Sequence, residues 1–151
     1  MIPINLEDIL EQSKFDNSNF FGSSKNHLLF KFGNPTEIET YKNQEKFYHY
    51  DNVRFGINQN EVESVEIFFY NYPDIKYNCK ADEEIINISK ELELNKLFFL
   101  LNDKKIEWAI NHEQSKFDYL MISLSNNIRI YYTIYDGFLD RIYIPVSSES
   151  N

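Results

Sequence analysis

The sequence predicts an α+β protein in which one or more antiparallel sheets carry short helices packed on one face. Aromatic residues make up 17% of the chain, with thirteen Phe and eleven Tyr, so a sizeable core is available. Short aromatic and β-branched runs are separated by turns of two to four residues, which is typical of antiparallel meanders. A helical apolar stripe with spacing i, i+3, i+4 and i+7 occurs within residues 91–102. At 151 residues, we expect a single domain over 1–151.

Two short helices are predicted to open the chain. Asn5 can cap an amphipathic helix over residues 6–13. Ser24 can cap a second helix, and Gly33 followed by Pro35 supplies its end. Aromatic and β-branched enrichment then predicts a three-strand meander, with strands over residues 47–50, 53–57 and 62–70.

The second half repeats this order of elements. The apolar stripe predicts a helix over residues 91–102, which ends at Asn102-Asp103. The dipeptide Asp136-Gly137 predicts a two-residue type I′ hairpin turn. Strands are expected over residues 106–111, 119–124, 128–135 and 138–144.

The two halves, about residues 1–75 and 76–146, can be read as two tandem helix-plus-meander units. Matching patterns recur at offsets that drift from 69 to 77 residues, as two copies with unequal loops would give. Accidental repetition of helices and hairpins is an equally good explanation. Between the halves, residues 71–84 are read as a polar linker, and residues 85–88 fit either a strand or the start of the helix.

The net charge of the chain argues against some classes of binding partner. There are 24 acidic and 15 basic residues, which gives a net charge of −9. This balance argues against nucleic acid or an anionic membrane as a partner, because both require concentrated Lys and Arg. Residues 1–75 hold twelve acidic and six basic residues, whereas residues 76–151 hold twelve and nine. The excess of acid therefore lies mainly in the first half.

The residues offer little catalytic chemistry. None of His27, His49 and His112 stands beside a Ser, Cys or Thr in a recognisable catalytic pattern, so we expect no catalytic residue. The sequence has no HxH, HxxxH or CxxC motif and no EF-hand loop, and its four glycines are scattered. We therefore expect no metal and no cofactor. Carboxylate pairs such as Asp136 and Asp140 could in principle perform hydrolysis, although 24 acidic residues produce such pairs by chance.

Tyrosines next to acidic residues are the best candidates for partner binding. Adjacent residues of a strand point to opposite faces, so Phe68 and Phe69 cannot both enter one core. Some aromatic side chains must then either cover the sheet against the other half or form a contact surface. The candidate partner-binding residues are Glu61, Glu66, Tyr70, Tyr72, Asp74, Tyr135, Asp136 and Asp140.

Two segments resemble a known family: the helix that ends in Phe32-Gly33-Asn34-Pro35, and the strand Val62 to Ile67 that follows it. This pattern resembles the small acidic immunity proteins of bacterial polymorphic and contact-dependent inhibition toxin systems. The helix, G-x-P and three-strand layout is also similar to the repeated unit of the β-lactamase inhibitory protein type. In the second half Asn102-Asp103 takes the place of G-x-P. Cognate toxins of this class are often nucleases with basic clefts, so the resemblance implies an acidic inhibitor.

We therefore predict a cytoplasmic immunity or inhibitor protein that binds a basic toxin domain by electrostatic complementarity. The single cysteine, Cys79, suits a reducing compartment, and no secretory signal or membrane span is read from the sequence. Two alternatives remain open. One is a structural or regulatory interaction module, either monomeric or homodimeric, and the other is a small hydrolase that uses a carboxylate pair.

Overall fold

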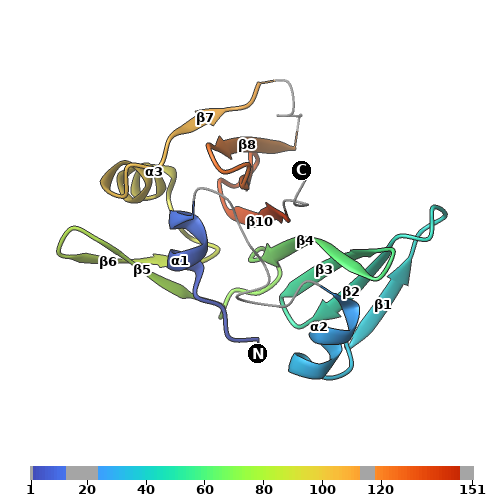
Figure 1. The fold of residues 1–151 in the computed structure, drawn as a ribbon. Helices are drawn as coiled ribbons and strands as arrows, with labels where there is room; N and C mark the ends of the chain where they lie inside the picture. Colours follow the sequence, from blue (N-terminus) through green and yellow to red (C-terminus); the bar gives the residue numbers. More distant parts are fainter. Residues whose placement is uncertain (1, 13–23, 113–117, 147–151) are drawn as a thin grey trace.

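The computed structural model describes residues 2–12, 24–112 and 118–146 of the chain (Figure 1). Three short helices occur in this part: α1 (Leu6–Glu11), α2 (Lys25–Phe32) and α3 (Leu94–Asp103). The strands of the first half are β1 (Glu37–Thr40), β2 (Lys46–Tyr50), β3 (Val53–Asn58) and β4 (Glu61–Phe68). Those that follow are β5 (Tyr77–Ala81), β6 (Glu84–Ile88), β7 (Trp108–Ile110), β8 (Tyr119–Leu124), β9 (Arg129–Thr133) and β10 (Leu139–Pro145).

The main sheet is antiparallel and has eight strands in the order β1-β2-β3-β4-β10-β9-β8-β7. Strands β1 to β4 form one meander and β7 to β10 form another, and the two meanders meet where β4 pairs with β10. A helix precedes each meander, α2 in the first half and α3 in the second. The predicted α+β class with an antiparallel sheet is therefore confirmed, and the helix-plus-meander layout occurs in both halves.

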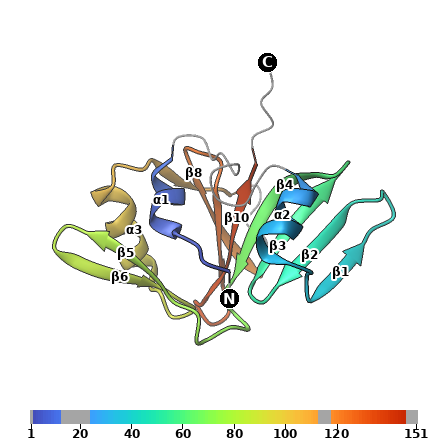
Figure 2. The ribbon, with the colours of Figure 1, turned by 60° about the horizontal axis from the view of Figure 1, so that its bottom comes forward.

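The helices and the separate β5–β6 hairpin lie on one face of the main sheet, which curves around them (Figures 1 and 2). Local signals explain how two of the helices begin. The Asn5 side chain accepts a hydrogen bond from the Asp8 amide, and the Ser24 hydroxyl accepts one from the His27 amide. Gly33 ends α2 with a φ of 77°, a left-handed conformation that favours glycine. The caps predicted from the sequence are thus confirmed.

Three predicted details of the strands are wrong. The first meander has four strands rather than three, because Glu37–Thr40 pairs with β2 as an edge strand. Residues 71–84 are not simply a linker, because Tyr77–Ala81 pairs with Glu84–Ile88 and forms the β5–β6 hairpin. The β9–β10 turn is not a two-residue type I′ turn. The Gly137 amide donates to the Thr133 carbonyl, and Gly137 has a positive φ whereas Asp136 does not.

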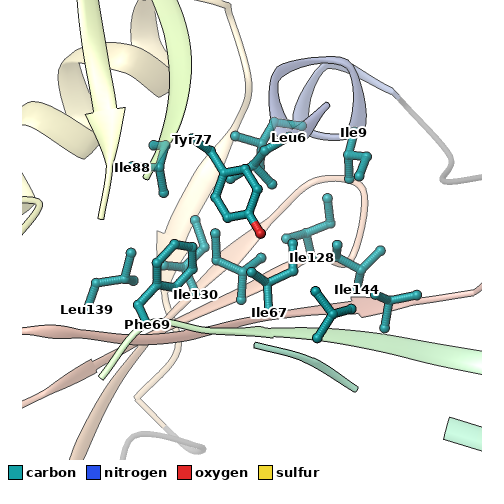
Figure 3. Close-up of a cluster of buried hydrophobic side chains, with 14 of the residues drawn as sticks. Leu6, Ile9, Ile67, Phe69, Tyr77, Ile88, Ile128, Ile130, Leu139 and Ile144 are labelled. Carbon is teal, nitrogen blue, oxygen red and sulfur yellow. The ribbon is translucent and has the colours of Figure 1, made fainter. Parts of the chain in front are cut away.

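The core lies between the main sheet and the layer formed by α1, α3 and the hairpin. Figure 3 shows Tyr77 of β5 between Leu6 of α1 and the sheet residues Ile67 and Ile130. The Tyr77 hydroxyl accepts a hydrogen bond of 3.1 Å from the side-chain amide of Asn52, so this polar atom is satisfied inside the core. Strands from both meanders thus share one core.

The side-chain alternation along β4 and β10 decides which residues face away from this core. Val65 and Ile67 of β4 are fully buried, and Phe69 just beyond the strand is also fully buried. Ile142 and Ile144 of β10 face the same way. Phe68 is only half-buried, so Phe68 and Phe69 take opposite faces, as the alternation rule predicts. The residues between these buried positions form the outer face of the sheet.

Candidate protein-interaction surface

The outer face of the main sheet is the surface turned away from the helices. Cross-strand pairing places Arg54 opposite Glu66, Glu66 opposite Tyr143, and Tyr143 opposite Arg129. A second row pairs Arg141 with Phe68 on one side and with Tyr131 on the other. The chain contains only three arginines, and all three lie on this face. The residues of the outer face discussed below are Phe47, Arg54, Glu66, Phe68, Tyr119, Arg129, Tyr131, Arg141 and Tyr143.

One carboxylate organises two of the arginines. The Arg54 guanidinium donates to Glu66 Oε1 at 2.8 Å, and Arg141 Nε lies 3.6 Å from Glu66 Oε2. The Glu66 side chain is only 9% exposed, whereas those of Arg54 and Arg141 are 21% and 29% exposed. Arg141 also reaches Asp140, at 3.0 Å. The buried acid is thus neutralised, and both guanidinium groups keep an edge toward solvent.

Aromatic rings contact the guanidinium groups of Arg54 and Arg141. The Arg54 guanidinium lies over the rings of Phe47 and Phe68, at 4.5 and 5.2 Å from their centroids. Arg141 lies 4.4 Å from the Tyr131 ring centroid and 5.4 Å from that of Tyr119. Cation–π contacts of this kind restrict the long side chains before any partner arrives. Less conformational entropy is then lost when a partner binds.

The Arg129 guanidinium lies 5.5 Å from the centroid of the Tyr143 ring. Both side chains are half-buried, and burial raises the pKa of the Tyr143 hydroxyl above its ordinary value. No ion pair joins Arg129 to an acid within the described residues. This guanidinium therefore keeps donors available for an incoming group.

A second cluster, the Tyr70–Asp136 corner, lies at the β9–β10 turn. The Tyr70 hydroxyl donates to Asp136 Oδ2 at 2.7 Å, and the Thr133 hydroxyl donates to Asp136 Oδ1. The Lys90 ammonium lies over the rings of Tyr70 and Phe138, at 4.5 and 4.8 Å from their centroids. The turn itself presents Tyr135, which is fully exposed, and Ile134, which is 55% exposed.

Ionisation at this corner follows from its hydrogen bonds and burial. The Thr133 and Tyr70 hydroxyls hold the pKa of Asp136 below its ordinary value, and the bond to Asp136 raises the pKa of Tyr70. Burial raises the pKa of Asp140, although Arg141 acts in the opposite direction. At neutral pH the corner thus presents a phenol that donates to an ionised carboxylate.

The structure brings five of the eight candidate residues into one region. Tyr70, Tyr135 and Asp136 belong to the corner, and Asp140 is connected to Glu66 through Arg141. Glu66 differs from the exposed acid that the sequence suggested, because it is buried and paired with arginine.

The other three candidates, Tyr72, Asp74 and Glu61, are not part of these contacts. Tyr72 is half-buried and Asp74 is exposed in the turns that follow Phe69. Glu61 begins β4 and Phe68 ends it, so about seven residues at about 3.3 Å each separate Glu61 from the corner. Glu61 therefore lies away from the Tyr70–Asp136 corner.

Sequence reasoning missed the three arginines. Their strands are recognisable from alternation, but the pairing of β4 with β10 joins segments far apart in the sequence. The useful signal was available all the same. Arg54 lies between the buried residues Val53 and Phe55, and Arg129 lies between the buried residues Ile128 and Ile130, which places both arginines on the face opposite the core. Arg141 gives a weaker signal, because buried Ile142 follows it but half-buried Asp140 precedes it.

The histidines and acids do not assemble a catalytic group in the described residues. His27 and His112 are exposed, and His49 Nε2 lies 2.9 Å from Glu39 on β1. Among the described residues, no group of three or more His, Cys, Asp or Glu side chains could hold a metal ion. Both oxygens of Asp136 accept hydrogen bonds from neighbouring protein groups.

No protein-family model matches the sequence, and no curated protein matches it. The chain is similar in structure to an extracellular protein containing a SCP domain from Bacillus anthracis str. Ames, with 12% sequence identity and a TM-score of 0.48. The match covers 90% of this chain and 47% of the other, so this chain spans about half of that protein's length.

No helix in the described part of the chain has the length and apolar character needed to cross a bilayer.

Proposed function

We propose that this chain is an immunity or inhibitor protein that binds and neutralises a cognate bacterial toxin domain. The outer face and the Tyr70–Asp136 corner form the contact surface in this proposal. One observation carries it: all three arginines of the chain are gathered with five aromatic side chains on a sheet face that no described helix or strand covers.

The composition of this face matches that of protein-binding hot spots. Tyr and Arg are enriched at positions that contribute most to binding free energy, whereas Lys and Glu are depleted there. Here Tyr119, Tyr131 and Tyr143 lie beside Arg141 and Arg129. The guanidinium groups are already held by rings and by Glu66, so the surface is preorganised.

The charge of the molecule supports a basic partner. The net charge of −9 must come from residues other than these, because the three arginines outnumber Glu66 and Asp140 by one. In the proposal the acidic residues elsewhere attract a basic toxin at long range, and the arginine–aromatic surface holds it at short range.

The proposed location is the cytoplasm. Cys79 is a free, buried thiol, which suits a reducing compartment.

A growth-rescue experiment tests the proposal. The reading frame next to this gene in its native genome is expressed in a host with and without this chain. We expect the neighbouring protein to stop growth and the wild-type chain to restore it. The variant Tyr135→Ala combined with Arg129→Ala should restore growth less well, because it removes a fully exposed tyrosine and an arginine free of acidic partners.

Phe30→Ala combined with Lys76→Ala is the matched control. Phe30 is 92% exposed on α2 and Lys76 is exposed before β5, so this variant also loses one exposed aromatic ring and one cation. It should restore growth like the wild type. A neighbouring protein that is harmless, or toxicity that this chain leaves unchanged, would contradict the proposal. Light scattering on the purified chain separates the alternative, a homodimeric interaction module, from a monomeric inhibitor.

A further inference from the structure

A hollow lined mainly by polar residues lies at the end of the first meander, well away from the corner described above. Its volume is about 360 Å³, within the range of about 300–1,000 Å³ typical of small-molecule sites. Three segments form its walls: the start of α2, the β1–β2 turn and the β3–β4 turn. The lining residues are Lys25, Thr40, Gln44, Lys46, Ile57, Gln59 and Asn60.

The fold brings these segments together by pairing that the structure shows directly. Thr40 pairs with Lys46, and Lys46 pairs with Ile57, so the three side chains lie on the same face of the sheet as the core. The Lys25 amide donates to the Asn60 carbonyl at 2.8 Å, which ties the first residue of α2 to the β3–β4 turn. On this face of the sheet, the buried cross-strand pair Tyr48 and Phe55 is therefore followed by polar residues toward the end of the meander.

The lining is rich in donors that have no partner among the described residues. No ion pair or side-chain hydrogen bond involves Lys25 or Lys46 in the described part of the chain, and no carboxylate lines the hollow. This is unusual in a protein with nine more acidic than basic residues. Of the acids nearest along the chain, Glu45 accepts a hydrogen bond from the Asn43 side chain, and neither Glu45 nor Glu61 lines the hollow.

Two different kinds of polar group therefore share one hollow. The ammonium groups of Lys25 and Lys46 favour an anion. The side chains of Gln44, Gln59, Asn60 and Thr40 can each donate to and accept from a hydroxyl group, and none of them has a side-chain hydrogen bond among the described residues. Gln44, Gln59 and Asn60 also have φ values of 66°, 50° and 66°, so both turns hold non-glycine residues in the left-handed region.

We infer that this hollow binds a small hydroxylated anion of the sugar-phosphate class. The phosphate lies between Lys25 and Lys46, and the hydroxyl groups contact the side chains of the two turns, with Ile57 as the apolar wall. This site is separate from the contact surface of the proposed function and does not depend on it.

Titration of the ¹⁵N-labelled full chain, followed by NMR, tests the inference. Glucose 6-phosphate is the probe, and glucose and inorganic phosphate are the two partial ligands. We expect saturable shifts with glucose 6-phosphate below about 10 mM, centred on the two turns, and weaker binding of each partial ligand. Lys25→Gln and Lys46→Gln should each weaken binding by about tenfold, because each removes a charge-assisted hydrogen bond.

Lys42→Gln is the matched control, since Lys42 is exposed in the same β1–β2 turn but does not line the hollow. It should bind like the wild type. Absence of saturable shifts, equal binding by Lys25→Gln, Lys46→Gln and the wild type, or equal affinity for inorganic phosphate would each overturn the inference. Well-dispersed spectra of the variants show whether they are folded.

Discussion

Glu66 shows how the meaning of a single residue depends on its neighbours in space. As one of 24 acidic residues it suggested a surface charge that could attract a basic partner. In the sheet it is 7% exposed and holds Arg54 and Arg141 in place. Replacing it would leave Arg54 without an acidic partner and Arg141 with Asp140 alone, so its substitution would disturb the outer face rather than the long-range field.

Cys79 gives a prediction at the same scale. The thiol is buried in β5, and burial raises its pKa to about 12, so it is neither exposed nor ionised near pH 8. We expect no reaction with Ellman's reagent in the native protein and one equivalent after unfolding in guanidinium chloride. Rapid labelling of the native protein would show that the Cys79 thiol is not buried in solution.

Asn126 is a polar residue on which the end of a helix depends. It is 7% exposed, and its side-chain amide donates to the carbonyls of Leu10 and Gln12 at 3.2 and 2.8 Å. These bonds satisfy carbonyl groups at the end of α1. We expect Asn126→Ala to lower the free energy of unfolding by about 1–3 kcal/mol in urea titrations. Ser125→Ala, at the exposed neighbouring position, should change it by less than about 0.5 kcal/mol, and equal effects would contradict this role.

At the scale of elements, local signals predicted the helices well and the short strands poorly. Asn5, Ser24 and Gly33 act within a few residues of themselves, so their effect can be read from sequence. β1 was missed because Glu37–Thr40 carries two acids and forms an exposed edge. β5 was missed because its alternation of buried and exposed residues follows Pro73 in a polar stretch.

An ion-pair cluster connects α1 with the end of α3. Lys104 donates to Glu7 and Glu11 at 2.7 and 2.6 Å, and its side chain is 7% exposed. The hydrogen bond from Lys104 lowers the pKa of Glu7. Burial alone would lower the pKa of Lys104, but the bonds to Glu11 and Glu7 outweigh it and raise the pKa.

The pH dependence of stability follows from the signs of these shifts. A lowered Glu7 pKa contributes stability above its unfolded value of about 4.3, and the contribution is lost as pH falls through the folded value. The raised Lys104 pKa contributes fully below its unfolded value of about 10.4 and is lost as pH rises through the folded value. The cluster therefore stabilises the fold across the neutral range.

We expect Lys104→Met to lower the free energy of unfolding by about 1–3 kcal/mol at pH 7. The difference from wild type should shrink between about pH 5 and pH 3, as Glu7 is protonated in both proteins. Urea unfolding followed by circular dichroism at several pH values measures this. Lys76→Met, at an exposed position, is the control. A difference that stays constant with pH would rule out the ion pairs as its cause.

At the scale of the whole molecule, the pairing of β4 with β10 creates both the continuous sheet and the candidate site. It aligns Arg54 and Glu66 of one meander with Tyr143 and Arg129 of the other. Sequence patterns predicted the antiparallel class and the opposite orientation of Phe68 and Phe69. They could not predict which strands meet, and Tyr70 lies 66 residues from the Asp136 that it contacts. A duplication that produced the two halves stays a prediction.

In the proposed function, the outer face and the Tyr70–Asp136 corner bind a toxin domain. The most direct test is the dissociation constant, measured by calorimetry, for the product of the neighbouring reading frame. We expect Tyr135→Ala and Arg129→Ala each to weaken binding at least about tenfold, whereas Phe30→Ala and Lys76→Ala stay within about twofold of the wild type. Equal affinities for all five proteins, or no binding by the wild type, would contradict the claim.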